Sequence, residues 1–245
     1  MVKKKRDTSW NDVAEWYDTH LVEEDDTYQK RVILPNVLRI LGLGGKERLL
    51  DLACGQGFFS REFDKTGARV TGCDISKELI DRATARSEKG ITYHVASAEK
   101  LLFASPASFD AVICILALQN IENLEEVYKE VSRVLTSQGR FIIVLNHPAF
   151  RIPKSSNWGW DEEKQIQFRR IEHYLSSAGV AIEMHPGSDG TTTFSFHRSL
   201  QEYFKAFAKS GFAVVRLEEW ISHKQSERGV RQRAENTARK EIPLF

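Results

Sequence analysis

In this 245-residue chain, the type and spacing of two aspartates and two glycines give the clearest indication of a ligand-binding site. Asp51 lies in an apolar run and is followed by Gly55 and Gly57, and Asp74 closes a second apolar run at 70–73. Parallel strands present their carboxyl ends at one edge of a sheet, so we expect Asp74 beside the glycine turn, within reach of both hydroxyls of a ribose. Glycines at such a turn let the backbone approach a ligand closely. The pattern therefore predicts a nucleotide cradle.

The residues around the turn indicate which kind of nucleotide it would hold. Dinucleotide-binding folds use G-x-G-x-x-G, but here Gly57 is followed by Phe58, Phe59 and Ser60, so the third glycine is missing. Asp51 would repel the pyrophosphate of NAD and attract the ammonium and sulfonium of S-adenosylmethionine. The loop thus favours a cationic cofactor.

With these motifs the chain resembles the class I S-adenosylmethionine-dependent methyltransferases, of the "methyltransferase type 11" kind. The resemblance extends from about Trp10 to about Ala149. Its motifs are the D-x-x-x-G-x-G loop at 51–57, the acidic end of the second strand at Asp74 and the segment after the third strand at 97–99. The fourth strand at 109–113 and the segment at 135–145 that leads into the fifth complete the match. The family more often has glycine where Ala53 stands.

The resemblance implies a cofactor-binding role for several residues. It places Asp51 at the methionine amino end, Asp74 at the ribose hydroxyls and Ile75 on the adenine face. The loop backbone would contact the cofactor at Ala53, Cys54, Gly55 and Gly57. Ala98 and Glu99 would meet the adenine edge, and Ile115 and Leu116 would line the methionine side. The Tyr17 ring would cover the cofactor. Plain core packing is the alternative for Ile75, Ala98 and Leu116.

The transfer step itself needs little machinery. Displacement at a sulfonium methyl depends mainly on holding the nucleophile in place, and a base is needed only for a protonated nucleophile. His147 follows the fifth predicted strand, at the ligand-binding edge, and is our first candidate for a base. His173, His185 and His197 are weaker candidates, and a hydrogen-bonded structural role is the alternative for all four.

Alternating apolar segments predict an α/β fold with a doubly wound, mostly parallel Rossmann-like sheet, an inserted cap, and a last strand that is incomplete or very short. We expect helices at 10–17, 28–41 with a kink at Pro35, 58–65, 77–88, 125–135 and 199–210. We expect strands at 48–52, 69–73, 91–95, 110–115, 139–145 and 212–220. As a single domain, the chain divides into N-terminal helices (1–45), a cofactor-binding core (46–149), a cap (150–197) and a C-terminal helix, strand and basic tail (198–245).

The expected cap is rich in aromatic residues and prolines. Trp158 and Trp160 suggest an aromatic pocket for a small acceptor, or a contact that merely attaches the cap. A hairpin is expected to pair residues 174–175 and 180–184 with 191–196 around the turn at 187–190.

Composition restricts the function classes further. The formal net charge of +1 offers no broad attraction for nucleic acid or membrane, no apolar run is long enough to span a bilayer, and the basic start lacks the apolar stretch of a signal peptide, so we expect a cytoplasmic protein. Cys54, Cys73 and Cys114 lack C-x-x-C spacing and are expected to be core thiols, so we predict neither disulfides nor a metal site.

The sequence thus predicts transfer of a methyl group from S-adenosylmethionine to an oxygen, nitrogen or carbon of a small molecule. The alternatives are an RNA methyltransferase whose basic tail, including Arg231 and Arg233, holds phosphates, a non-catalytic cofactor-binding protein, and an NAD-dependent oxidoreductase. The absence of an N-P-P-Y or D-P-P-Y segment after the fourth strand weighs against nucleobase amines as acceptors. The acceptor's identity and the oligomeric state are left open.

Overall fold

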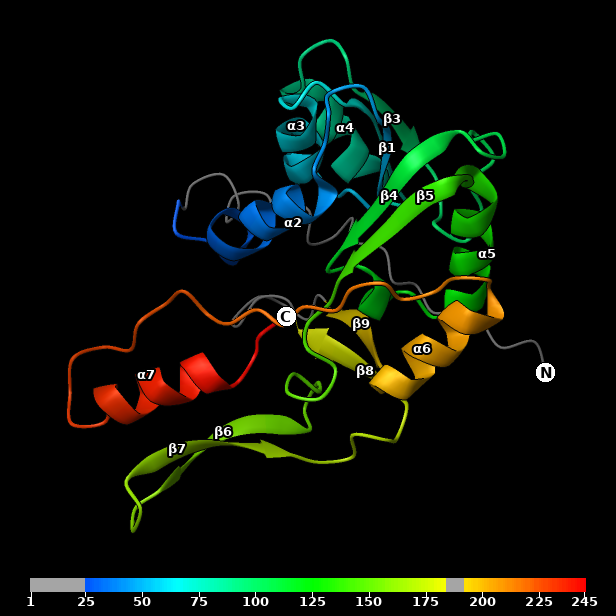
Figure 1. Ribbon diagram of the computed structural model, residues 1–245. Coiled ribbons are helices and arrows are strands. Elements are labelled where there is room, and N and C mark those ends of the chain that lie inside the picture. Colours follow the sequence, from blue (N-terminus) through cyan, green and yellow to red (C-terminus); the bar gives the residue numbers. More distant parts are fainter. Residues whose placement is uncertain (1–24, 184–191) are drawn as a thin grey trace.

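The computed structural model describes residues 25–183 and 192–245. Five parallel strands form one sheet in the order β3-β2-β1-β4-β5 (Figure 1). They are β1 (Arg48–Leu52), β2 (Arg69–Asp74), β3 (Thr92–Val95), β4 (Phe109–Ile115) and β5 (Leu135–Val144). The chain order reverses between β1 and β4, which in a doubly wound sheet is where a ligand crevice forms at the carboxyl edge. The predicted fold class is confirmed.

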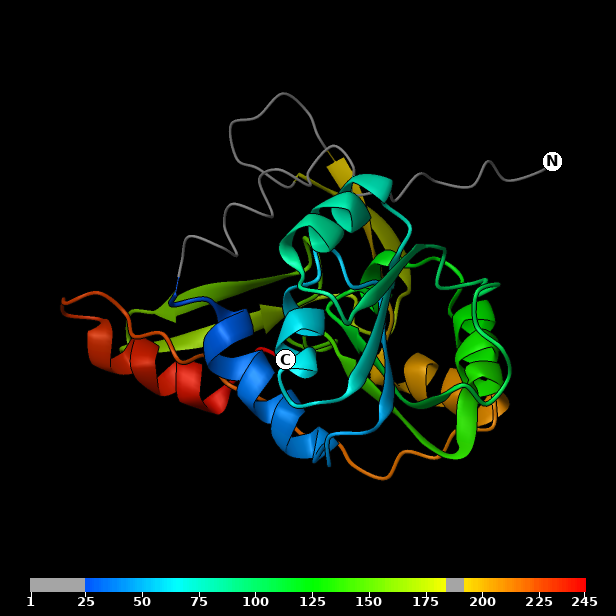
Figure 2. The same ribbon diagram turned by 90° about the horizontal axis from the view of Figure 1, so that it is seen from above.

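Helices cover both faces of this sheet (Figure 2). On one face α5 (Leu124–Val134) and α6 (Leu200–Lys209) bury Tyr128, Val131 and Tyr203 against β1 and β4. On the other, α2 (Leu34–Leu41) and α3 (Phe58–Asp64) bury Val37, Leu41 and Phe63. The helix α4 (Lys77–Arg86) contacts β2 and β3. Central strands covered on both sides must be apolar throughout, which is why β1 and β4 are almost wholly buried.

The helix expected at 28–41 changes its hydrogen-bond pattern near Pro35. A π-helical turn, η2 (Gln29–Ile33), leads without a gap into α2, and Pro35 lies just after this change, where it has no N–H to donate to the preceding turn. The helix expected at 28–41 is thus continuous, and the irregularity near Pro35 is a change of helix type. The helix expected at 10–17 lies outside the described residues.

A second, unpredicted hairpin projects from the core, formed by β6 (Ser156–Asp161) and β7 (Ile166–Ile171). Gly159 pairs with Phe168, whose ring lies where a Cβ on Gly159 would be. The ring therefore covers the glycine across the strands and holds the register. The helix α7 (Gln232–Glu241) packs on β7.

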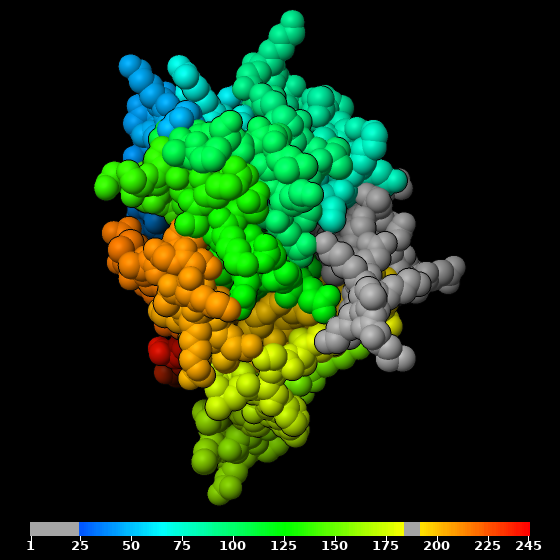
Figure 3. Space-filling model, turned by 90° about the vertical axis from the view of Figure 1, so that its right-hand side faces the viewer, coloured from blue at the N-terminus to red at the C-terminus, as the bar shows by residue number. Residues whose placement is uncertain are grey.

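The hairpin expected near the end of the cap is confirmed where 180–183 pair with 192–195, in the antiparallel strands β8 (Ala178–Glu183) and β9 (Thr192–His197). Residues 174–175, also expected in the first strand, lie in a turn before β8. The hairpin's expected turn, Gly187–Gly190, lies outside the described residues. Figure 3 shows β8 and β9 on the same face of the molecule as α5 and α6, with the β6–β7 hairpin beyond them. Through these elements the cap lies beside the β4–β5 half of the sheet.

The strand expected at 212–220 is wrong. This segment is extended but joins no sheet, and Val215 is 94% exposed. At its start the Phe212 N–H donates to the Phe207 carbonyl, and at its end Trp220 donates to the Phe245 carbonyl and accepts from Leu244 and Phe245. Valine-rich composition favours a strand only where a partner edge is available, and this segment pairs with no described strand.

Candidate cofactor site

The glycine turn follows β1 and is held in an unusual backbone conformation. Ala53, Gly55 and Gly57 have φ values of 58°, 56° and 77°. The turn is attached to β2 because the Cys54 N–H donates to the Cys73 carbonyl at 2.9 Å. Positive φ suits glycine and strains alanine, so Ala53 occupies a position where the family's glycine would be relaxed.

Asp74 lies at the end of β2 and is joined to this turn. Its Oδ2 accepts the Gly55 N–H at 3.0 Å and its Oδ1 accepts the Ser76 N–H at 2.9 Å. Burial raises the pKa of Asp74, and these backbone donors oppose that rise. A carboxylate offers about four acceptor positions, so the backbone donors leave capacity for a ligand hydroxyl.

Asp51, predicted to face the methionine amino end directly or through water, is buried next to the turn. It is 2% exposed, and its Oδ2 accepts the Ser60 hydroxyl at 2.6 Å. Burial raises its pKa to about 7, the Ser60 hydrogen bond opposes this, and the Asp74 charge adds to it. Asp74 and the ionised fraction of Asp51 therefore give the turn a negative field, and Asp51 acts on a ligand through that field or through water.

The reason for glycine at position 57 differs from the one predicted. A Cβ there would lie 2.5 Å from the Tyr93 hydroxyl and 3.0 Å from the Ala83 Cβ, so the space that Gly57 leaves is filled by this chain's own residues. Gly72 on β2 leaves room for the same ring, whose Cε1 would be 2.6 Å from a Cβ. Both glycines let Tyr93 pack beneath the turn.

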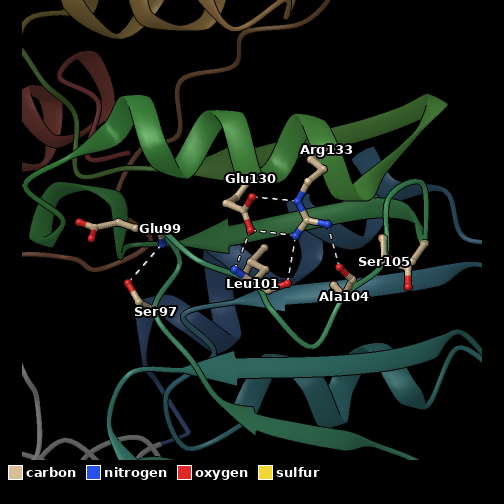
Figure 4. A network of polar contacts seen from close by, with 8 residues as sticks. Ser97, Glu99, Leu101, Ala104, Ser105, Glu130 and Arg133 are labelled. Atoms are coloured by element: carbon tan, nitrogen blue, oxygen red, sulfur yellow. Dashed lines mark hydrogen bonds and ion pairs between the residues drawn. The ribbon is translucent and has the colours of Figure 1, made fainter.

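The segment after β3 carries Ala98 and Glu99 and is anchored to α5 (Figure 4). The Arg133 guanidinium donates to the carbonyls of Ala104 at 2.8 Å and Leu101 at 3.0 Å, while Glu130 accepts the Leu101 N–H at 2.7 Å. Ala98 is 8% exposed and belongs to the core, and Ser97 accepts the Glu99 N–H at 3.2 Å. The Glu130–Arg133 pair, which the sequence analysis missed, thus positions the predicted adenine-side residues.

The predicted methionine-side residues follow β4. Ile115 is 9% exposed and packs in the core, and Leu116 has a strained φ of 54°. Leu116 donates its N–H to the Val144 carbonyl at 2.8 Å, and its own carbonyl accepts the Gln119 amide at 2.7 Å. Contacts on both sides hold this turn at the sheet edge, a setting in which such strain is often functional.

His147 does not have the free nitrogen that a base requires. Its Nδ1 accepts the N–H groups of Ala149 (3.1 Å) and Phe150 (3.3 Å), so the proton is on Nε2, which donates to Glu219 at 2.7 Å. In this arrangement neither nitrogen offers a lone pair to a substrate. The geometry supports the structural alternative, with His147 shaping the chain after β5.

The other predicted site residues fall into three groups. Tyr17 and His185 lie outside the described residues. The His197 ring donates its Nε2 proton to the Tyr174 carbonyl at 2.8 Å, and His173 is exposed. The three cysteines are buried free thiols whose pKa values are raised by burial, as expected of core residues.

The tryptophans predicted to line a pocket contact arginines. Arg231 lies 4.5 Å from the Trp160 ring and donates to Glu162 at 2.6 Å, and Arg169 lies 5.3 Å from Trp158. Trp160 therefore helps attach α7 to the hairpin, and Arg231, proposed for RNA phosphates, is already engaged.

The residues at the turn fit S-adenosylmethionine. The buried Gln56 Nε2 is a donor without a partner among the described residues, which suits a polar ligand group. Ile75, directly after Asp74, is 49% exposed and offers an apolar surface to a purine. The two carboxylates suit a cation and not a pyrophosphate. Across 25–183 and 192–245 no cluster of metal-ligating side chains occurs, and none of the helices there has the length and apolarity to cross a bilayer.

Comparison with known proteins agrees with this geometry. Residues 50–143 match the family model of the methyltransferase domain. The chain is 32% identical over 145 residues to a demethylmenaquinone methyltransferase of Tropheryma whipplei, covering 57% of this chain and 58% of that protein. It is 31% identical over 135 residues to a ubiquinone biosynthesis O-methyltransferase of Xylella fastidiosa, covering 54% of each. The alignments thus span a little over half the length of these relatives.

A solved structure matches over most of the chain. It is an S-adenosylmethionine-dependent methyltransferase from Mesorhizobium loti, with a TM-score of 0.70 and 28% identity, covering 90% of this chain and 95% of that one. Together with the glycine turn and the sheet order, these likenesses show that the chain carries a class I S-adenosylmethionine-dependent methyltransferase domain.

Proposed function

We propose that this protein transfers a methyl group from S-adenosylmethionine to an oxygen, nitrogen or carbon atom of a small molecule. The observation that carries the proposal is that two acidic residues, Asp51 and Asp74, both lie at the glycine turn. Their bonds are to Ser60, Gly55 and Ser76, and within the described residues neither carboxylate forms an ion pair with a basic side chain. An uncompensated negative field at this edge of the sheet favours a cationic cofactor.

Each part of the site has a task in this proposal. Asp74 binds the ribose hydroxyls with its remaining acceptor positions, and Ile75 covers one face of the adenine. The segment at 97–99 borders the adenine edge because Glu130 and Arg133 hold it there. The bound cofactor supplies an electrophilic methyl group, and the chain's contribution is to hold an acceptor in line with it and to exclude water.

The cap and the chain after β5 favour a small acceptor. A cavity of about 40 Å³ lies among residues of η3 (Leu118–Asn120), β9, α6 and the segment following β5. Its lining joins the rings of Phe196 and Tyr203 to polar side chains such as Asn146, which suits a small molecule that is apolar in part. Arg231, which an RNA site was expected to use, is bonded to Glu162.

The test is a transfer assay with S-adenosylmethionine labelled in its methyl group and pools of small phenols, catechols and amines. Label that enters a small product with matching release of S-adenosylhomocysteine supports the proposal. Binding of S-adenosylhomocysteine without transfer in any pool supports a non-catalytic cofactor-binding protein instead. Transfer only to RNA would contradict the small-molecule proposal.

A further inference from the structure

The small cavity next to the β4–β5 edge is lined by two basic side chains and by no acidic ones. Its walls include Gln119 after β4, Asn146 after β5, Arg151, and Arg198 after β9. Phe196 and Tyr203, which are 7% and 3% exposed, add ring surface. The cavity is therefore apolar in part and positively charged, at the edge where an acceptor would meet a cofactor methyl group.

Each arginine has a buried nitrogen that forms no well-aligned hydrogen bond with a described residue, although the Arg198 guanidinium also interacts with the Tyr203 hydroxyl. These are the Nε of Arg151 and the Nη1 of Arg198. A buried N–H without a partner costs roughly 1–3 kcal/mol, and more on a charged group, so two such donors at one cavity call for an explanation. An oxygen of a ligand in the cavity is the kind of acceptor that each of these donors lacks.

The two guanidinium groups are held in place by other contacts. Arg198 donates from Nη2 to the carbonyls of Ile121 at 3.0 Å and Glu122 at 2.6 Å, and lies 5.4 Å from the Phe196 ring. Arg151 lies 5.7 Å from the Trp158 ring. Since these contacts fix the orientation of the groups, a ligand would meet donors that are already positioned.

Within residues 25–183 and 192–245, no acidic side chain acts on the charge of Arg151. Its pKa is lowered to about 10, mainly by burial and next by the charge of Arg169, with a smaller contribution from Arg239. An anion in the cavity would remove this electrostatic cost.

We propose that this cavity binds a carboxylate of the methyl acceptor, through Arg151 and Arg198, so that the acceptor is a small organic acid. The inference rests on the proposed function and narrows its substrate class. The lining favours an anionic group, because the cavity offers two guanidinium groups and no acidic side chain. A guanidinium and a carboxylate also match in geometry.

The test compares benzoate with benzamide, which share a shape and differ in charge. The full chain is first titrated with S-adenosylhomocysteine by calorimetry, and this step alone reports on the proposed function. Benzoate or benzamide is then titrated into the complex. We expect benzoate to bind at least about 10-fold more tightly than its amide. Equal binding of the two, or binding of neither, overturns the carboxylate proposal even where the cofactor product binds.

Variants of Arg151 test whether benzoate binds through the charge of this cavity. Arg151→Gln should weaken benzoate binding on the order of 10-fold and leave the binding of S-adenosylhomocysteine unchanged. Arg170→Gln is the matched control, because Arg170 is exposed on β7 and paired with Glu172, so benzoate binding should not change. Arg151→Lys, which keeps the charge but loses the Nε donor, should fall between the two. Benzoate binding by Arg151→Gln as tight as by the parent contradicts the proposal.

Discussion

Asp51 and Asp74 give the cofactor edge its charge, and each meets a different environment. Asp74 is held by backbone N–H groups, whereas Asp51 is buried with a single hydroxyl donor. Burial of an acid without a cationic partner raises its pKa, and for Asp51 the value reaches about 7. The residue that attracts a cation thus makes the ligand-free protein less stable, and a bound cation would relieve that cost.

This conflict predicts a pH dependence of stability. The pKa of Asp51 rises from 3.8 to about 7 on folding, so between about pH 4 and pH 7 the native state binds more protons than the unfolded state. Stability from this group therefore falls as pH rises through that window. In urea titrations, Asp51→Asn should gain stability relative to the parent from pH 5 to pH 8, by on the order of 3 kcal/mol. Parallel curves for the two proteins would show that Asp51 is not the group responsible.

Ala53 predicts a second residue-scale effect. Its φ of 58° is costly for an L side chain by roughly 1–2 kcal/mol, against a cost of about 0.5–1 kcal/mol for the greater freedom of an unfolded glycine. Ala53→Gly should therefore stabilise the fold by about 0.5–1 kcal/mol in urea unfolding. Ala85→Gly on α4 is the control and should destabilise by about 1 kcal/mol. A loss of stability in Ala53→Gly would mean that the turn differs from the one described.

At the scale of elements, the order of strands and helices was predictable because the parallel strands are buried on both faces. Strands such as β4 are almost continuously apolar and are therefore easy to recognise in the sequence. The first and last residues of β1 were both predicted correctly. The β6–β7 hairpin was missed because its register depends on Phe168 covering Gly159, a contact between strands. The segment 212–220 has strand composition but no partner, which local sequence does not reveal.

The anchoring of the 97–105 segment is also an element-scale property. The Arg133 guanidinium and the Glu130 carboxylate make three bonds to its backbone, and Arg133 holds the pKa of Glu130 below its usual range. Arg133→Met should destabilise the fold by about 2 kcal/mol, since buried carbonyls lose charged donors. It should also increase hydrogen exchange at 97–105. Lys129→Met removes only an exposed pair with Glu126 and should change stability by less than about 0.5 kcal/mol. Equal effects of the two variants would contradict the anchoring.

The whole molecule combines a cofactor edge that is negative with an acceptor cavity that is positive. The turn at Asp51 and Asp74 was predictable from sequence, because its residues are close along the chain or end neighbouring strands. The cavity of Arg151 and Arg198 was not, because it forms only when the cap folds against the β4–β5 side. The same reason explains the failure of His147 as a base candidate, since its partner Glu219 is distant in sequence.

The central claim is that Asp74 belongs to a site for S-adenosylmethionine, and calorimetric titration of the parent and Asp74→Asn tests it most directly. We predict that S-adenosylmethionine and S-adenosylhomocysteine bind the parent with dissociation constants on the order of micromolar, that NADH does not bind, and that Asp74→Asn weakens both by roughly 10- to 100-fold. Thermal unfolding of the variant serves as the control for folding. Tight binding of NADH alone, or unchanged affinity in a folded Asp74→Asn, would contradict the account.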